Sequence, residues 1–414
     1  MIAARAWQFI MGAACIACLF LPQGGVVSQA NVDSIHSIAW RPDGLQFATG
    51  HGMGDVRVWD ATTGALLYTF NVSEFPGSLA IDEVDWHPTG IQIAVAASTP
   101  VHPGAFLWVL EASTGEVLHD LSSGSMMHDV AWSPDGTLLV SAIVREFGSE
   151  FMGTAGEAGI DIWDVTTEQL IAELDANTYD VVFKVAWSPD SSRLASTSWA
   201  TTTIWDSQTW TVLIQMGEKS HLPTPFWVTW SPDGTRVATP GVDGLAYIWD
   251  ATTGDLLITL RSGGEDQLDQ IEWQPGGNLL AGRSDHVLIY WDATTGQQVD
   301  RMETSNRLTY IAWSPDGSRL LYSDNTSEQP QFAVIPSLPP TSTPTPTLTP
   351  TETPTATATP TATPTPTETP TFTPTPDPVI FFDDFESGSG NWTATGRWAL
   401  NSQYHYSGSW AFAN

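Results

Sequence analysis

Four acidic residues could carry acid–base chemistry if the fold brings them together: Asp82, Glu83, Asp129 and Asp269. Each lies a few residues before a tryptophan. Hydrolysis of a glycosidic bond needs two carboxyl groups about 5 to 10 Å apart, one as the acid and the other as the base or nucleophile. The sequence therefore allows a secreted enzyme that acts on polysaccharide, provided that two of these side chains meet in one cleft.

Other catalytic signatures are missing from the sequence. It has no nucleophile elbow, no His-Glu-x-x-His motif, no phosphate-binding loop and no dinucleotide fingerprint. The nine histidines lack metal-ligand spacing, and the only cysteines, Cys15 and Cys18, lie near the N-terminus. We therefore predict no catalytic residue, no metal site and no cofactor, and we favour a protein that is not an enzyme.

A tryptophan-led turn phrase, in its fullest form Trp-Ser-Pro-Asp-Gly, organises most of the chain. Its copies begin at Trp40, Trp86, Trp132, Trp187, Trp230, Trp273 and Trp313. They are 46, 46, 55, 43, 43 and 40 residues apart, a period typical of propeller blades. Each phrase predicts a tight turn, because Pro presets φ, Asp binds nearby amides and Gly accepts positive φ.

A second mark, Trp-Asp, follows five of the seven phrases, and a Thr-Thr-Gly turn or a looser version of it comes after most of them. It lies at residues 59–60, 163–164, 205–206, 249–250 and 291–292, and we align Trp108-Val109 with it in the second unit. Apolar runs flank both marks, so each unit is expected to form four short antiparallel strands. Seven such sheets would stack face to face and close into a ring, which removes most exposed sheet edges.

These residues resemble the WD40-repeat β-propeller family over residues ~35–335. The resemblance implies an all-β, seven-bladed propeller that binds protein or peptide partners and does no chemistry. Many members place a Gly-His pair before the first strand of each blade, and that His bonds to an Asp and a Trp. The pair is absent before these strands, so we expect blade rigidity to rest more on tryptophan and aliphatic packing, with the tryptophans in the core.

Alignment of the seven units reveals two variable columns at the start of the innermost strands, which line the channel in this family. The fourth residue before each repeat tryptophan is His36, Asp82, His128, Phe183, Phe226, Asp269 or Thr309. The following residue is Ser37, Glu83, Asp129, Lys184, Trp227, Gln270 or Tyr310. We predict that both columns lie near the mouth of the channel, where they either line a wet channel or contact a partner.

The third unit is the longest because it contains a Gly-rich insert over residues 145–159. By the same resemblance, this hairpin opens on the face that carries the mouth, and Phe147, Phe151 and Met152 would be exposed there. Long loops often carry function. The insert is thus a second candidate for partner contact, and sequence drift is the alternative explanation.

The charge balance narrows the choice of partners. The chain has 46 acidic and 14 basic residues, a net charge of −32. Such a chain repels phosphate backbones and anionic lipid surfaces, so we expect no nucleic-acid and no peripheral membrane binding. We expect a monomeric propeller with a solubilising acidic surface.

Residues 1–30 have the pattern of a secretory signal, with Arg5, a short apolar run over 9–21 and small residues at Ser28 and Ala30. Cleavage after Ala30 would leave a secreted or cell-surface protein, which we expect to be bacterial. The propeller would then occupy residues 31–336. Cleavage there would also remove residues 26–27, which could supply a fourth strand to the last blade. The sequence leaves open earlier cleavage or a three-stranded last blade.

The last 78 residues are expected to form a linker and part of a second module. Residues 337–378 are almost pure Thr-Pro, which favours an extended polyproline II linker, either O-glycosylated or bare. Residues 379–414 resemble the first strands of secreted bacterial jelly-roll modules, which often bind carbohydrate or act in adhesion. The segment is too short for a core, so we expect a truncated module. Its acidic residues 383, 384 and 386 either bind calcium in a whole module or are solvated.

Overall fold

The computed structural model describes residues 33–72, 79–99, 105–123, 125–144, 158–175, 181–198, 201–217, 226–264 and 267–338, together with two short strands near the C-terminus. The chain divides into two compact units, Met1–Thr343 and Pro344–Asn414. In the second unit, β28 (Ala399–Asn401) pairs with β29 (Ala411–Ala413). None of the described residues forms a helix long and apolar enough to cross a membrane.

Several predicted features lie outside the described residues. They are the signal segment 1–30, the linker beyond residue 338, most of the predicted module 379–414, and the loop residues Phe147, Phe151 and Met152.

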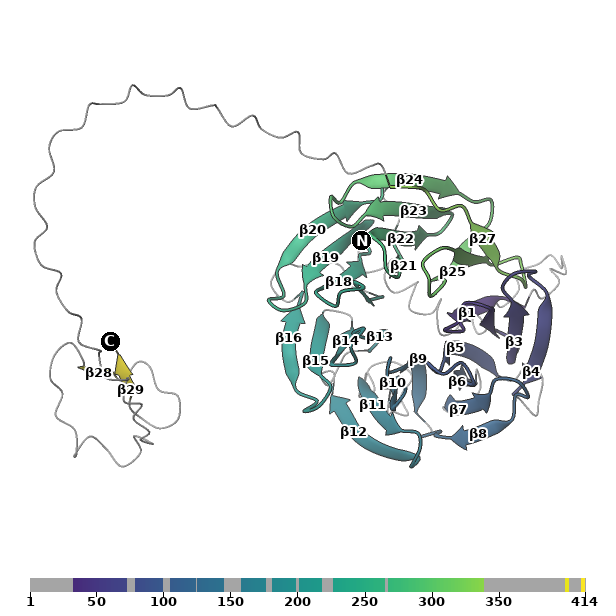
Figure 1. Cartoon of the computed structure of the whole chain (residues 1–414), viewed down its shortest axis with the longest axis horizontal. Coiled ribbons are helices and arrows are strands. Elements are labelled where there is room, and N and C mark those ends of the chain that lie inside the picture. Colours follow the sequence, from purple (N-terminus) through teal and green to yellow (C-terminus); the bar gives the residue numbers. More distant parts are fainter. Residues whose placement is uncertain are drawn as a thin grey trace, which may run out of the picture. The chain divides into compact units, whose positions relative to one another are not determined.

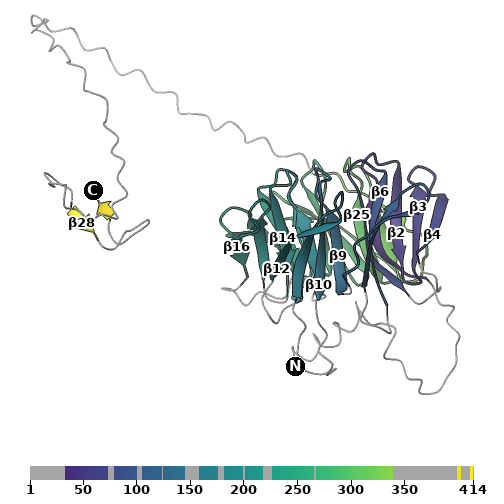
Figure 2. The ribbon, with the colours of Figure 1, turned by 90° about the horizontal axis from the view of Figure 1, so that it is seen from below.

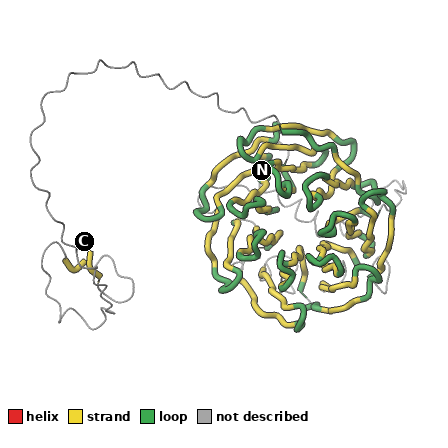
Figure 3. Tube along the Cα trace, viewed as in Figure 1, coloured by secondary structure: helices red, strands yellow, loops and turns green. Residues whose placement is uncertain are grey.

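The first unit is a ring of seven antiparallel sheets, so the prediction of an all-β, seven-bladed propeller is confirmed (Figures 1 and 3). Six sheets have four strands in sequence order, and the seventh has three among the described residues. The strands run along the ring axis (Figure 2). The first strand of each blade lies nearest the axis (Figure 1).

The bounds of the strands, blade by blade, are as follows. Blades 1 and 2 contain β1 (Ile35–Trp40), β2 (Gln46–His51), β3 (Asp55–Asp60), β4 (Leu66–Asn71), β5 (Ala80–Trp86), β6 (Gln92–Ser98), β7 (Ala105–Glu111) and β8 (Val117–Asp120). Blades 3 and 4 contain β9 (Met126–Trp132), β10 (Leu138–Val144), β11 (Ala158–Asp164), β12 (Gln169–Asp175), β13 (Lys184–Trp187), β14 (Arg193–Thr197), β15 (Thr202–Asp206) and β16 (Val212–Met216). Blades 5, 6 and 7 contain β17 (Thr229–Trp230), β18 (Arg236–Pro240), β19 (Leu245–Asp250), β20 (Leu256–Arg261), β21 (Gln270–Trp273), β22 (Leu279–Ser284), β23 (Val287–Asp292), β24 (Gln298–Glu303), β25 (Leu308–Trp313), β26 (Leu320–Asp324) and β27 (Gln331–Ala333).

The turn phrases adopt the predicted conformation between the first and second strands. Gly44 has a φ of 69°, and Ser191 takes 60° at the same place in blade 4. In the fullest copies the Ser hydroxyl donates to the Asp, as Ser231 does to Asp233 at 2.5 Å. These bonds hold the pKa of Asp233 down at about 2. Backbone and hydroxyl bonding therefore accounts for the turn aspartates without any catalytic role.

The strand register corrects one alignment in the second unit. Leu110 pairs with Ile93, as Trp59 pairs with Phe47 in blade 1. Trp108 pairs two residues away, with Val95. The counterpart of the Trp-Asp mark is therefore Leu110-Glu111 rather than Trp108-Val109. The sequence alignment followed the tryptophan and missed that Glu111 takes the part of the turn aspartate, accepting bonds from the next turn's hydroxyls.

The hydrophobic core lies between blades, and the repeat tryptophans sit in it. All seven indoles of the turn phrases are at most 9% exposed. Trp40 Nε1 donates to the carbonyl of Ala312 in the preceding blade at 3.1 Å, and Trp230 Nε1 donates to that of Ala186 at 2.9 Å. Trp187 and Trp313 make the equivalent bond. In these four blades the indole joins two sheets as well as filling space. Trp273 Nε1 donates instead to Gly277 of its own blade, and the indole N–H groups of Trp86 and Trp132 have no hydrogen-bond partner among the described residues.

Arginines of the turn hairpins complete this junction. Arg193 donates to the carbonyls of Gly234 and Ala251 in the next blade at 2.6 and 2.9 Å. Its guanidinium lies 4.8 Å above the Trp230 ring. The same arrangement recurs at Arg319. Each of these arginines therefore covers the repeat indole of the following blade.

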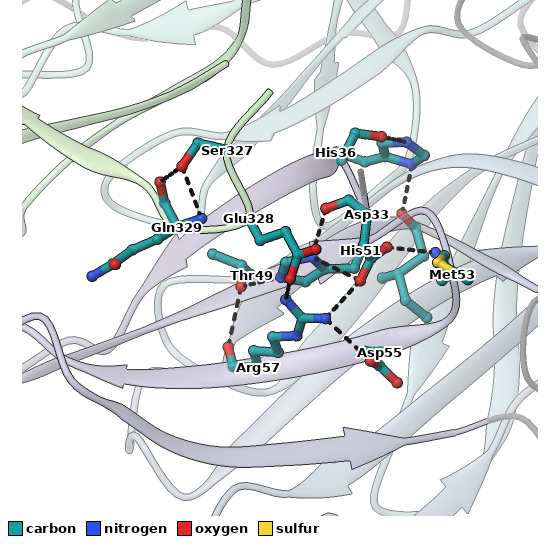
Figure 4. A network of polar contacts seen from close by, with 12 residues as sticks. Asp33, His36, Thr49, His51, Met53, Asp55, Arg57, Ser327, Glu328 and Gln329 are labelled. Atoms are coloured by element: carbon teal, nitrogen blue, oxygen red, sulfur yellow. Dashed lines mark hydrogen bonds and ion pairs between the residues drawn. The ribbon is translucent and has the colours of Figure 1, made fainter. Parts of the chain in front are cut away.

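Blade 7 joins blade 1 through side chains in the described part of the chain, where its sheet ends at β27. Arg319 donates to the carbonyls of Ala61 and Gly44 at 2.6 and 2.7 Å. Arg57 of β3 pairs with Glu328 of blade 7 at 3.1 Å (Figure 4). A three-stranded last blade, one of the two alternatives left open by the sequence, is therefore compatible with ring closure.

A polar chain inside blade 1 shows that rigidity there rests on hydrogen bonds as well as on the expected tryptophan and aliphatic packing. Trp59 Nε1 donates to Thr49 Oγ1, which bonds to His51 Nε2, each at 2.8 Å. His51 Nδ1 contacts the carbonyl of Asp33 at 3.3 Å, and Arg57 pairs with the Asp33 carboxylate at 2.7 Å (Figure 4). Here the aspartate precedes the first strand and the histidine ends the second, so a search for Gly-His before the first strand could not find the chain.

Replacement of Arg319 tests the seam between blades 7 and 1. Arg319→Met keeps the apolar stem but removes two hydrogen bonds from a charged group. The free energy of unfolding should therefore fall by about 2–3 kcal/mol. Urea unfolding followed by tryptophan fluorescence measures this. Arg261→Met, on the exposed outer strand β20, should change stability by less than about 0.5 kcal/mol. Equal stability of the two variants would show that these bonds do not hold the seam.

Candidate functional site

The inner strands begin with an irregularity that the sequence did not reveal. In β1, β5, β9 and β25 the pairing with the second strand skips one residue. The skipped residues are His36, Asp82, His128 and Thr309. Each is the extra residue of a β-bulge, which re-aims side chains and bends the strand.

Blades 4 and 6 show the same feature in their hydrogen bonds. The amide of Phe183 donates to the carbonyl of Thr197, the residue that pairs with Lys184. The amide of Asp269 likewise donates to the carbonyl of Arg283, whose pairing partner is the next residue, Gln270. Two consecutive residues of the inner strand thus share one partner in six blades.

The bulges arrange the two variable columns as two layers at one end of the ring, which we call the mouth. The outer layer contains His36, Asp82, His128, Phe183, Phe226, Asp269 and Thr309, of which His36 is exposed and the others are half-buried. The inner layer contains Ser37, Glu83, Asp129, Lys184, Trp227, Gln270 and Tyr310, of which Lys184 and Trp227 are half-buried and the others buried. The two columns, which the sequence does not distinguish, therefore differ in burial: most of the inner layer is buried and the outer layer is partly exposed.

Lys184 is the centre of a polar network in the inner layer. Its Nζ lies 2.7 Å from Asp129 Oδ1 in blade 3 and 3.5 Å from Glu83 Oε1 in blade 2. Glu83 also accepts the Tyr310 hydroxyl of blade 7 at 2.6 Å. Lys184 Nζ lies 4.2 Å from the centre of the Trp227 ring in blade 5. One ammonium thus connects four blades directly, and a fifth through Glu83.

Glu272 extends the network to blade 6, although the sequence analysis did not single it out. It accepts the Trp227 indole N–H at 2.7 Å and the Gln270 amide at 3.2 Å. A signal was available: the residue before the repeat tryptophan is alanine in four units but Asp85, Thr229 and Glu272 in the others. Residues two apart on a strand share a face, so this third column continues the inner layer.

The inner layer also joins neighbouring blades through their main chains. The amide of Val84 donates to Ser37 Oγ at 3.0 Å, and the amide of Val185 donates to Asp129 Oδ2 at 2.7 Å. The amide of Ile311 donates to Gln270 Oε1 at 2.9 Å in the same way. Each acceptor binds the next blade at its uniform apolar column, so these three residues have a structural role.

Burial dominates the electrostatics of the inner layer. Desolvation raises the pKa of Glu83 to about 8 despite the attraction of Lys184. It raises the pKa values of Asp85 and Glu272 to about 7, and it also raises that of Asp129. Burial therefore outweighs the attraction of the single ammonium, and Glu83, Asp85 and Glu272 retain protons into the neutral range.

The outer layer contains one carboxyl oxygen without a hydrogen-bond partner. Oδ2 of Asp82 is buried and unpaired in the described structure. This burial raises the pKa of Asp82 to about 7, and a bond from Ser98 only partly opposes the rise. By contrast, Asp269 pairs with Arg283 at 3.1 Å. Burial lowers the pKa of His128 to about 4, so its imidazole is neutral at physiological pH.

An aromatic pair lies beside these polar groups. The rings of Phe183 and Phe226, from adjacent blades, meet edge to face with their centres 4.9 Å apart. Thr309 bonds to Ser323 at 2.7 Å, and His36 Nδ1 donates to the carbonyl of Ile81 at 3.2 Å. Among the described residues, no group of three or more His, Cys, Asp or Glu could hold a metal ion.

Comparison with known families agrees with this architecture. Residues 5–79 match the anaphase-promoting complex subunit 4 WD40 domain, and residues 168–206 and 220–250 match the WD domain, G-beta repeat. This chain is a WD40-repeat protein. The family resemblance drawn from the turn phrases is thereby confirmed.

The WD40 protein is also similar to longer eukaryotic proteins. It is 26% identical to the WD repeat-containing protein slp1 of Schizosaccharomyces pombe over 41% of the chain and 32% of the relative. It is 24% identical to WD repeat-containing protein 1 of Gallus gallus over 62% and 48% of the two chains. For the intraflagellar transport protein 80 homolog of Mus musculus the identity is 27%, over 46% and 22%. The chain thus spans less than half the length of each of these relatives.

Replacement of Lys184 tests the network. Lys184→Met leaves Glu83 and Asp129 buried without their cation, so the WD40 ring should lose about 3 kcal/mol of stability. Denaturant unfolding at pH 7 measures the loss. Arg301→Met, which removes a half-buried cation from the outer strand β24, serves as the control and should cost less. A stability equal to wild type for Lys184→Met would mean that the ammonium does not hold the blades together.

The raised carboxyl pKa values predict a loss of stability as the pH rises. Asp82, Glu83, Asp85 and Glu272 bind protons more tightly in the folded state than in the unfolded state. Their contribution to the free energy of unfolding is therefore complete below pH 4 and is lost as the pH rises through 7 to 8. The neutral His128 opposes this trend only below pH 6.5. The melting temperature should therefore fall between pH 6.5 and 8.5. The fall should be shallower in Glu272→Gln, which keeps an acceptor oxygen, and unchanged in the exposed control Glu303→Gln; a melting temperature that rises over this range would contradict the assignment.

Proposed function

We propose that the ring is a non-catalytic scaffold that binds an extended segment of a protein or peptide partner at the mouth. The observation that carries the proposal is the contrast between the two layers. The inner layer is tied into a network that leaves its polar groups occupied, whereas the outer layer keeps partly exposed aromatic, imidazole and carboxyl side chains. Aromatic anchors beside a few polar groups are typical of binding hot spots.

The relatives support interaction with proteins over catalysis. One matched family is named for a subunit of the anaphase-promoting complex, and one relative is named for intraflagellar transport. These names describe membership in protein assemblies. They do not identify the partner of this chain.

The arrangement of the candidate catalytic carboxyls also favours a scaffold. Glu83 and Asp129 both bind Lys184, and Asp269 binds Arg283. A hydrolase needs a pair of carboxyls with access to substrate, and Asp82 is the one member of the four with an unpaired oxygen among the described residues. The glycoside hydrolase alternative therefore has little support.

We further propose that the ring is exported. This rests on the signal pattern of residues 1–30 and on the acidic surface that follows it in the sequence. A tail module that binds carbohydrate would place the ring near a polysaccharide, with the Thr-Pro segment as the spacer.

Selection of displayed peptides tests the proposal. The full chain, including its first 30 residues, is expressed in a secreting host. Recovery from the medium of a protein whose intact mass corresponds to a chain that starts at Asn31 supports export. A random peptide library is then selected on the immobilised protein. Selected peptides should bind Phe226→Ala at least tenfold more weakly than wild type, because the aromatic anchor is lost, and should bind the outer-strand control Leu257→Ala equally well.

Two outcomes would overturn the scaffold assignment. Peptides that depend on Leu257 but not on Phe226 would move binding from the mouth to the rim. Turnover of a glycan panel that disappears in Asp82→Asn would show catalysis. Circular dichroism of each variant establishes that loss of binding is not loss of fold.

A further inference from the structure

In blades 2 and 5 the two layers of the mouth present similar side chains, one residue apart in sequence. Carboxyl groups come from blade 2 in both layers, Asp82 in the outer and Glu83 in the inner. Aromatic rings come from blade 5 in both, Phe226 and Trp227. Because the bulges give consecutive residues one pairing partner in β5, the outer layer follows the inner layer closely in space.

The inner layer is a cation site filled by the chain itself. The Lys184 ammonium lies 4.2 Å from the centre of the Trp227 ring and 2.7 Å from Asp129. It also faces Glu83 at 3.5 Å. An aromatic face and carboxylates around one ammonium are the elements of a cation-binding site.

The outer layer has these elements but supplies no cation to Asp82 from the described residues. Oδ2 of Asp82 is buried with no hydrogen-bond partner, which costs free energy unless a donor is provided. Arg283, a cation of blade 6 near the mouth, is already engaged by Asp269 at 3.1 Å and by the carbonyl of Leu308. Phe183 and Phe226 provide apolar surface on the side of blades 4 and 5.

The inner layer also sets the distance that a ligand must bridge. Glu83 and Lys184 are the chain neighbours of Asp82 and Phe183, and their side chains meet at 3.5 Å although they come from blades 2 and 4. One lysine side chain and one acidic side chain therefore suffice to connect these two blades at this depth. A lysine of a partner could connect Asp82 and Phe183 in the outer layer in the same way.

We propose that the outer layer binds a lysine or arginine side chain of the partner segment. Its charged head would pair with Asp82, and its methylene stem would pack on Phe183 and Phe226. This inference rests on the proposed function and gives it a chemical class of ligand. The neutral imidazole of His128 adds no competing positive charge, and the pairing of Asp269 with Arg283 leaves Asp82 as the preferred acceptor.

Capped tripeptides test this inference on the full chain. Ac-Ala-Lys-Ala-NH₂ and Ac-Ala-Arg-Ala-NH₂ are compared with Ac-Ala-norleucine-Ala-NH₂, which keeps the stem without the charge. Saturation-transfer NMR at 150 mM salt measures binding while screening the overall negative charge. Binding of the lysine and arginine peptides should be at least tenfold weaker in Asp82→Asn than in the wild type. The norleucine peptide should bind the wild type no more tightly than the lysine peptide binds Asp82→Asn.

Asp300→Asn provides the matched control, because it removes the same charge from the exposed outer strand β24. It should bind the basic tripeptides as wild type does. Asp82→Asn should fold, since the exchanged oxygen Oδ2 makes no hydrogen bond; should it fail to fold, Phe226→Leu supplies a second test with the same expected loss. Equal binding of the lysine peptide by wild type and Asp82→Asn, or by Phe226→Leu in the second test, would overturn the inference.

The selected peptides separate this inference from the proposed function. Peptides that need Phe226 but contain no basic residue and ignore Asp82 would leave the scaffold in place and refute the cation site. Peptides that do not use the mouth, together with no tripeptide binding, would refute both.

Discussion

The junction between neighbouring blades is the interaction on which the rest of the structure depends. A blade of four short strands cannot bury both faces alone, so its stability comes from the sheets on either side. Every repeat indole fills the space between sheets, and in four blades it also donates a hydrogen bond to the preceding blade. Arginines from that blade cover the indole, and the same contacts close the ring.

Ring closure also brings distant parts of the chain to one axis, and this creates the network at the mouth. Lys184 and Tyr310 come from blades 4 and 7, yet both bind Glu83. The inner layer gains cohesion from charges buried together, at the cost of desolvation. The outer layer, built by the same bulges, keeps partly exposed aromatic, imidazole and carboxyl side chains, which we propose contact the partner. In this proposal, structure and recognition occupy successive residues of the same strands.

Much of the fold could be predicted because its determinants are local. Pro, Asp and Gly define the turns within five residues, and the spacing of tryptophans counts the blades. The positions at the start of the inner strands could also be predicted, since repeats align by sequence. Two predictions failed because they depend on contacts between strands. The alignment placed Trp108 at the Trp-Asp mark, whereas strand register places Leu110 there. The family pattern puts the histidine before the first strand, whereas His51 ends the second strand and Asp33 precedes the first.

The sequence by itself determined the number of blades, the turn geometry and which residues begin the inner strands, because these depend on local backbone preference and on period. Only the tertiary structure decided which of those residues are bound to one another. A β-bulge depends on pairing with a second strand, and a network around Lys184 depends on blades up to 227 residues apart, as in the bond from Tyr310 to Glu83. The unpaired oxygen of Asp82 is likewise a consequence of burial, and burial depends on tertiary contacts rather than on residue type.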